Sequence, residues 1–272
     1  MPDHDSTELA SGKLLLDRPA EAVARLVIGN PGKRNALDHE ILDAIATTMG
    51  ELEDGIETRC VIITGSDGMF SAGYDIGDIP DEVFAEEAER LVAHPFSRAI
   101  EAVERFPFPT LAAINGHALG GGLELAVTCD LRIAAAGTKL GMPPAKLGLI
   151  YSHTGIQKFL DTVGPARTRE LFFTGRNVTA ERAEQIGLVH EVASREQIEA
   201  AAVELAAEIA GNAPVSLKGN KQIINALLTF APLSESLERE LIELRLSSFR
   251  TEDFREGVRA FGEKRKPRWQ GR

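Results

Sequence analysis

Short apolar runs alternate with helical patterns in the first half of the chain. Residues 37–52 carry apolar side chains at 37, 41, 42, 45, 49 and 52, the spacing of an amphipathic helix. Further helices are expected over 86–104 and 123–128. Buried strands are expected at 14–16, 23–28, 60–64, 110–114 and 131–135. Strands that alternate with helices predict an α/β fold rather than a β-sandwich.

The pattern becomes almost wholly helical after Thr154. Helices are expected at 155–162, 165–173, 180–186, 195–210, 215–228, 234–248 and 252–262. We divide the chain into a disordered tail (1–12), an α/β core (13–211) and a helical C-terminal region (212–272). That last region has leucines at 233, 237, 241 and 244. This stripe could fold back on its own domain or pack against another subunit, and the sequence leaves both open.

Composition and charge narrow the function classes. The 272 residues are 43% hydrophobic and 26% charged, and the net charge is −11. A nucleic-acid-binding protein would carry a basic surplus, because neutralised phosphates supply most of its affinity. No apolar run approaches the ~18 residues of a membrane span. Because the first 13 residues are polar and acidic, unlike a signal peptide, we expect a cytoplasmic protein.

The cysteines indicate no redox or metal chemistry. Cys60 and Cys129 each lie in an apolar run and form no CxxC pair, which predicts buried free thiols. No cluster of His, Cys and Asp has metal-ligand spacing, so no metal site is expected. Nothing in the sequence indicates a flavin or a nicotinamide cofactor.

Two glycine-containing loops follow buried strands, at 70–76 and 116–122. Glycine lets a ligand approach the backbone, and the second loop opens a helix whose first N–H groups carry partial positive charge. Such a loop suits an anion or a polarised carbonyl oxygen. The sequence lacks the dinucleotide, P-loop and serine-hydrolase motifs. Taken alone, the three glycines at 120–122 could equally serve close packing of a helix on a strand.

Glu124 is the candidate acid/base next to the second loop. Its neighbours at 123 and 125–127 make the segment apolar on nearly every side. A carboxylate in such surroundings is expected to be partly buried, which suits a general acid or base. The alternative is a solvated residue on the surface of the helix.

Several motifs together resemble the crotonase superfamily, also called the enoyl-CoA hydratase/isomerase family. The resemblance runs from about residue 14 to 268. The matching segments are NPGKRNAL (30–37), VIITG (61–65), FSAGYDI (70–76), INGHALGGGLELA (114–126) and FGEKRKP (261–267).

The resemblance implies a crotonase-like spiral of ββα turns with a C-terminal helical trimerisation region. It also implies a homotrimer or a dimer of trimers. The ligand would be an acyl-CoA thioester, whose carbonyl oxygen would sit between the backbone N–H groups of Tyr74 and Gly121. CoA, present only as part of this substrate, would contact Arg34, Ala36, Leu37, Ser71, Ala72, Gly73, Asp75, Ile76, Pro143 and Lys264. For Arg34 and Lys264, plain surface charge is the other interpretation.

The chain departs from the family pattern at one catalytic position. Hydratases of this family use two glutamates to position one water; the first corresponds to Glu124, and the second would fall at Pro144. Proline cannot donate or accept a catalytic proton. Family members that decarboxylate malonyl-type thioesters also lack the second glutamate. They carry a tyrosine at the position of Tyr151, although the one we compare has histidine where this chain has Tyr74.

Three functional hypotheses follow from these residues. The first is an enzyme of enoyl-CoA hydratase/isomerase type, a lyase of fatty acid metabolism, with Glu124 as the sole carboxylate acid/base. The second is a decarboxylase of a malonyl-type CoA thioester that uses Tyr74, Glu124 and Tyr151. The third is a non-catalytic acyl-CoA-binding protein. Tyr151 could also be a wall of the pocket.

Overall fold

A computed structural model describes residues 6–75, 90, 92–228, 235–265 and 267–268. Its larger sheet has the strand order β1-β2-β3-β4-β6-β8-β11. These strands are β1 (Thr7–Leu9), β2 (Leu14–Ala20), β3 (Val23–Ile28), β4 (Cys60–Gly65), β6 (Thr110–Ile114), β8 (Leu131–Ala135) and β11 (Glu191–Ala193). The pairs β1–β2 and β2–β3 are antiparallel, and every pair from β3 to β11 is parallel.

A second sheet of short strands has the order β10-β9-β7-β5. Its members are β5 (Met69–Ser71), β7 (His117–Leu119), β9 (Lys139–Gly141) and β10 (Val178–Thr179). Three successive chain turns place one strand in the larger sheet and the next in the smaller sheet: β4–β5, β6–β7 and β8–β9. A helix then follows, so the expected spiral of ββα turns is confirmed.

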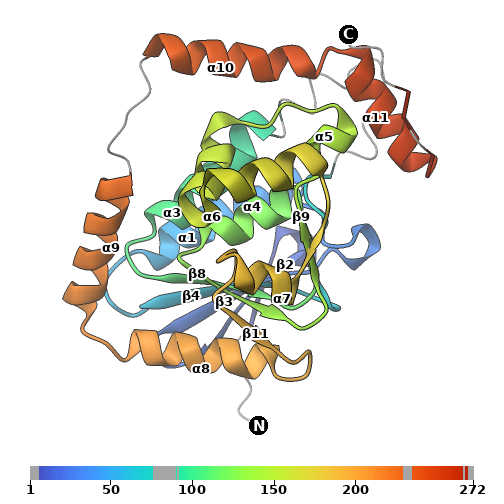
Figure 1. Ribbon diagram of the computed structural model, residues 1–272. Helices are drawn as coiled ribbons and strands as arrows, with labels where there is room; N and C mark the ends of the chain where they lie inside the picture. The colour runs from blue at the N-terminus through green and yellow to red at the C-terminus, as the bar shows by residue number, and fades with distance from the viewer. Residues whose placement is uncertain (1–5, 76–89, 91, 229–234, 266, 269–272) are drawn as a thin grey trace.

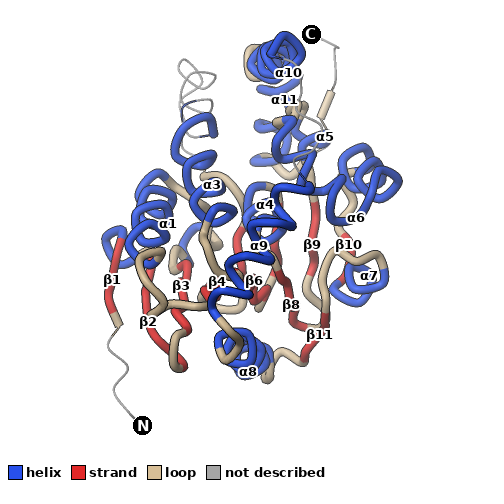
Figure 2. The backbone as a smooth tube through the Cα atoms, turned by 90° about the vertical axis from the view of Figure 1, so that its left-hand side faces the viewer, coloured by secondary structure: helices blue, strands red, loops and turns tan. Residues whose placement is uncertain are grey.

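Helices cover both faces of the larger sheet, as Figures 1 and 2 show from two sides. One face carries α1 (His39–Leu52), α3 (Ser97–Arg105), α4 (Gly121–Thr128) and α6 (His153–Thr174), and the other carries α8 (Ile198–Ala210). Strand β4 alternates between the two cores: Val61 and Ile63 belong to the larger cluster, whereas Cys60 and Ile62 pack with α8. Burial on both faces explains why this strand is apolar throughout.

The remaining helices lie in the second half of the chain. They are α5 (Pro144–Leu147), α7 (Ala180–Gln185), α9 (Pro214–Leu228), α10 (Glu235–Ser248) and α11 (Glu252–Gly262). Helix α9 runs along one side of the core, and α11 lies beside α5 (Figure 1). The helices expected at 155–162 and 165–173 join into α6, which breaks at Gly164 and Pro165.

Several expectations need correction or fall outside the described residues. The prediction that residues 1–12 form a disordered tail is wrong for residues 7–9, which form β1 and pair with β2. Of the helix expected at 86–104, the described part is a π-helix over Val92–Phe96 followed by α3. Of the leucine stripe, Leu237, Leu241 and Leu244 lie in α10, but neither their side chains nor Leu233 belong to the described residues. The expected boundary after residue 211 falls in the segment between α8 and α9, which covers residues 211–213, and the division into domains stays a prediction.

The two cysteines are buried and free, as predicted. Burial raises the pKa of each thiol to about 12, so neither forms a thiolate at neutral pH. Among the described residues, no group of three His, Cys, Asp or Glu side chains could hold a metal ion. Within those same residues, no helix has the length and apolar character needed to cross a bilayer.

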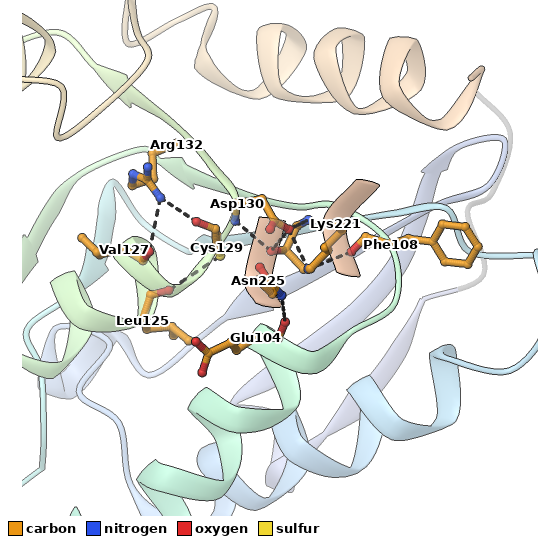
Figure 3. Close-up of polar contacts among 10 residues, drawn as sticks. Glu104, Phe108, Leu125, Val127, Cys129, Asp130, Arg132, Lys221 and Asn225 are labelled. Carbon is orange, nitrogen blue, oxygen red and sulfur yellow. Dashed lines mark hydrogen bonds and ion pairs between the residues drawn. The ribbon is translucent and has the colours of Figure 1, made fainter. Parts of the chain in front are cut away.

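A buried lysine attaches α9 to the core (Figure 3). Lys221 Nζ donates to Asp130 Oδ2 at 2.7 Å and to the Phe108 carbonyl at 3.0 Å. The Asp130 carboxylate also accepts from the backbone and side chain of Thr110, at 2.7 and 2.9 Å. Because Asp130 follows the last turn of α4, this cluster fixes the end of that helix. Arg132 donates to the Val127 and Cys129 carbonyls at the same end.

We expect Lys221→Met to lower the free energy of unfolding by about 2 kcal/mol. Breaking a buried ion pair costs roughly 3–5 kcal/mol and an exposed pair roughly 0–1 kcal/mol. The Lys221 side chain is 8% exposed and that of Asp130 is 30% exposed, so the loss falls between these limits. Urea unfolding measures it, with Lys218→Met, at an exposed position of the same helix, as the matched control. Equal stability of both variants would contradict the prediction.

Candidate active site

The two glycine loops meet at backbone contact. Strands β5 and β7 are neighbours in the smaller sheet, so the loops that follow them leave from the same edge. Gly73 has a φ of +99°, and a Cβ added there would lie 2.9 Å from the Leu119 carbonyl and 3.2 Å from the Gly121 nitrogen. Only glycine combines this conformation with this approach. The backbone nitrogens expected to hold a carbonyl oxygen are therefore close neighbours.

A third segment supports the first loop. The Leu37 N–H donates to the Gly73 carbonyl at 2.7 Å, and the Asp75 N–H donates to the Leu37 carbonyl at 3.0 Å. The Ala72 N–H donates to the Arg34 carbonyl at 3.0 Å. The predicted CoA-contacting residues of the two segments, 34–37 and 71–75, are thus brought together.

The glycines at the start of α4 have separate roles. A Cβ on Gly122 would lie 2.6 Å from the Ser71 Cβ, so this glycine permits close packing of α4 on β5. A Cβ on Gly121 would lie 2.5 Å from Cε1 of the Tyr74 ring. Gly121 is also the first residue of α4, where backbone N–H groups have no partner within the helix. The packing interpretation is therefore confirmed at Gly122, and the binding of a carbonyl oxygen at Gly121 stays a prediction.

Glu124 is buried beside these glycines and bonded to a tyrosine. Its side chain projects from the first turn of α4, and the residue is 3% exposed. The Tyr151 hydroxyl donates to Glu124 Oε2, and the Tyr74 hydroxyl lies 3.2 Å from the Tyr151 hydroxyl. The interpretation of Glu124 as a solvated surface residue is wrong.

The protons in this cluster can be assigned from its electrostatics. Burial raises the pKa of Tyr151 well above its usual value, and the neighbouring Glu124 charge raises it further. Tyr151 therefore stays neutral and uses its single O–H group to donate a hydrogen bond to the Glu124 carboxylate. In the hydrogen bond between the two phenol hydroxyls, Tyr74 must then be the donor. The resulting chain runs from Tyr74 through Tyr151 to Glu124.

Aromatic packing and one further glycine hold the tyrosines in place. The Tyr74 ring packs edge-on against Phe96, with centroids 4.7 Å apart, and Tyr151 packs against Phe172 at 5.6 Å. A Cβ on Gly155 would lie 2.7 Å from the Tyr151 ring and 2.8 Å from Glu124 Oε1. Sequence reasoning missed Gly155 and Phe172, because nothing in the local pattern shows that α6 approaches α4 here.

Known proteins share this sequence pattern and fold. The family model of enoyl-CoA hydratase/isomerase matches residues 18–272. The short-chain-enoyl-CoA hydratase of Clostridium acetobutylicum is 35% identical over 247 residues, which cover 90% of this chain and 92% of that protein. The chain belongs to the enoyl-CoA hydratase/isomerase family.

Two solved structures illustrate the range of the family. Methylmalonyl-CoA decarboxylase in complex with 2-nitronate-propionyl-CoA superposes with a TM-score of 0.86 at 27% identity, covering 96% of this chain and 99% of that chain. Enoyl-CoA hydratase from Bacillus anthracis superposes with a TM-score of 0.73 at 30% identity, covering 96% and 100%. The family and fold are therefore shown, and the reaction has to be argued from the site.

The other residues expected in the family site have more varied positions. Pro144 is buried as the first residue of α5, and Pro143 precedes it, half-buried. Lys264 is exposed just after α11. Within the described part of one chain, no side-chain bond joins it to the glycine loops, and its approach from a neighbouring subunit stays a prediction. Ile76 lies outside the described residues.

A cavity of about 500 Å³ lies elsewhere, between α1 and α3. It is lined by His39, Asp43, Arg90, His94, Pro95, Ser97, Arg98 and Glu101. None of these residues belongs to the glycine loops or to the Glu124 cluster. The candidate acid/base group, Glu124, lies instead beside the glycine loops, at the start of α4.

Proposed function

We propose that this chain binds an acyl-CoA thioester and acts through the thioester enolate, with Glu124 as its acid/base. The observation that carries the proposal is the buried contact of Glu124 with Tyr151 beside the glycine loops. A carboxylate in that position can take a proton from the carbon next to the thioester carbonyl. The C–H electron pair then moves onto the carbonyl oxygen, and the proton moves to Glu124.

The negative charge that forms on the oxygen needs fixed hydrogen-bond donors. We assign these to the backbone N–H groups of Tyr74 and Gly121, supported by the close approach of Gly73 to the Gly121 nitrogen. One such donor is worth about 2.7–4 kcal/mol of the barrier, and the start of α4 adds its partial positive charge. The CoA portion would contact Arg34, Ala36, Leu37, Ser71, Ala72, Gly73, Asp75, Ile76, Pro143 and Lys264.

Chemistry with a single carboxylate fits this site better than hydration does. Hydration by the family's route uses two carboxylates to hold one water, and Pro144 provides none at the second position. With a 3-enoyl thioester, Glu124 removes an α proton to give a dienolate and can return it to the γ carbon, which moves the double bond. We therefore favour isomerisation or another enolate reaction over efficient hydration.

Decarboxylation of a malonyl-type thioester is the second candidate. The observations that favour it are Tyr151 at the site and the likeness to methylmalonyl-CoA decarboxylase. In this reaction the bond to the carboxylate breaks, its electron pair forms the enolate, and carbon dioxide leaves. A proton that Glu124 takes up from solvent would then pass to the α carbon of the enolate and complete the product.

One panel of substrates tests both candidates and the non-catalytic alternative. Butyryl-CoA is incubated in D₂O and assayed by mass spectrometry for deuterium at the α carbon, which reports enolate formation directly. The 3-butenoyl, crotonyl and methylmalonyl thioesters report double-bond movement, hydration and decarboxylation. We expect deuterium uptake and at least one conversion. Binding of butyryl-CoA with neither result would support the non-catalytic alternative.

We also propose self-association as a homotrimer or a dimer of trimers. Helix α9 exposes several large apolar side chains, Val215, Ile223, Ile224, Leu227 and Leu228. Exposed apolar side chains gathered on one helix support a role in association. Light scattering of the purified protein measures the assembly, and a monomer at micromolar concentration would contradict the proposal.

A further inference from the structure

We propose that the side chain of Tyr74 limits the substrate to short acyl groups. This inference rests on the proposed function and adds the size of the acyl group to it. Tyr74 was singled out for its backbone N–H, whereas the argument here concerns the opposite end of the same residue.

The Tyr74 phenol is held on three sides. Its ring lies over Gly121, where a Cβ would come within 2.5–2.9 Å of three ring atoms, and its edge-on contact with Phe96 fixes a second side. The hydroxyl lies 3.2 Å from that of Tyr151. The ring therefore extends from the first loop, across the start of α4, to the acid/base cluster.

The position of the acyl group follows from the reaction. Its carbonyl oxygen must reach the backbone N–H groups of Tyr74 and Gly121, and its α carbon must reach Glu124. The Glu124 carboxylate is bonded to the Tyr151 hydroxyl, and that hydroxyl is next to the Tyr74 hydroxyl. Carbons beyond the α position therefore meet two phenol groups.

A long apolar chain fits poorly against these groups. To pass, it must displace a phenol and leave buried hydroxyls without their hydrogen bonds, which is unfavourable. A short acyl group, or one with a polar substituent, leaves the tyrosine pair intact. The order of preference should therefore run opposite to hydrophobicity, which by itself favours longer chains by roughly a factor of four for each buried methylene.

The test is calorimetric binding of butyryl-CoA and octanoyl-CoA to the full chain and to two matched variants. Tyr74→Phe keeps the ring and removes the hydroxyl, whereas Tyr74→Ala removes the ring. We expect the wild type to bind octanoyl-CoA no more tightly than butyryl-CoA. Tyr74→Ala should bind octanoyl-CoA at least 10-fold more tightly than the wild type does, and Tyr74→Phe, which keeps the ring but loses one hydroxyl, should gain less than Tyr74→Ala. Tyr74→Leu, which refills part of the space, replaces Tyr74→Ala if the latter does not fold.

The outcomes separate the two proposals. Wild-type protein that binds octanoyl-CoA much more tightly than butyryl-CoA would overturn the size limit and leave the enolate chemistry standing. So would an alanine or leucine variant with an unchanged order of preference. Failure to bind either thioester would overturn the proposed function, and the size limit with it.

Discussion

Glu124→Gln should lower the turnover of the preferred acyl-CoA by about 10²–10⁴-fold, the usual contribution of a general acid or base. Glutamine has nearly the same shape as glutamate, and its amide oxygen can still accept a hydrogen bond from the Tyr151 hydroxyl. It cannot take a proton from the α carbon. Because the side chain is 3% exposed, water cannot easily replace it as a base. Deuterium uptake by butyryl-CoA and steady-state turnover should fall together, while binding changes little.

Two further variants make this result specific. Glu51→Gln changes an exposed glutamate of α1 and should leave turnover unchanged. Tyr151→Phe removes the hydroxyl that donates a hydrogen bond to Glu124 and should reduce the rate less than Glu124→Gln does. Because burial and the Glu124 charge raise the pKa of Tyr151, its ionisation should add no alkaline limb to the pH profile. Full deuterium uptake in Glu124→Gln would exclude Glu124 as the base.

The sequence predicted the parts of the fold that depend on local patterns. The apolar strands, helix α1 and the burial of Glu124 all follow from the spacing of side chains within one segment. The strands of the smaller sheet escaped prediction because all four have three residues or fewer, and β5 and β7 overlap the glycine-containing loops. A pattern of period two needs about four residues to be recognised.

Long-range contacts escaped prediction for a different reason. Lys221 reads as one more charge on an amphipathic helix, yet it is buried on Asp130, 91 residues away. The bond from Tyr151 to Glu124 joins residues 27 positions apart and depends on Gly155. The family resemblance marked both Tyr151 and Glu124 as site residues, but only the fold shows that the two side chains are hydrogen-bonded to each other.

Gly121→Ala should reduce kcat/KM by about 10²–10³-fold, the loss expected when one donor to the developing oxyanion is displaced. Helix propensity alone would favour the change, since alanine is better than glycine in a helix by up to about 1 kcal/mol. Sterics decide otherwise, because the new Cβ would lie 2.5 Å from Cε1 of the Tyr74 ring. Either the Tyr74 ring or the first turn of α4 must move. The ring belongs to the residue whose backbone N–H is one proposed oxyanion donor, and the first turn of α4 carries the other.

Two controls distinguish loss of the oxyanion donor from a general loss of stability. One is an alanine substitution at a second glycine, and the other is Gly121→Ala in a Tyr74→Ala variant. Gly219→Ala lies in α9, where a Cβ meets nothing within 4 Å, and should leave turnover close to the wild type while raising stability by up to about 1 kcal/mol. When Tyr74 is replaced by alanine, the ring that conflicts with residue 121 is absent. Adding Gly121→Ala to that background should therefore cost much less than it costs in the wild type. An equal cost in both backgrounds would show that Gly121 is required for a reason other than its contact with Tyr74.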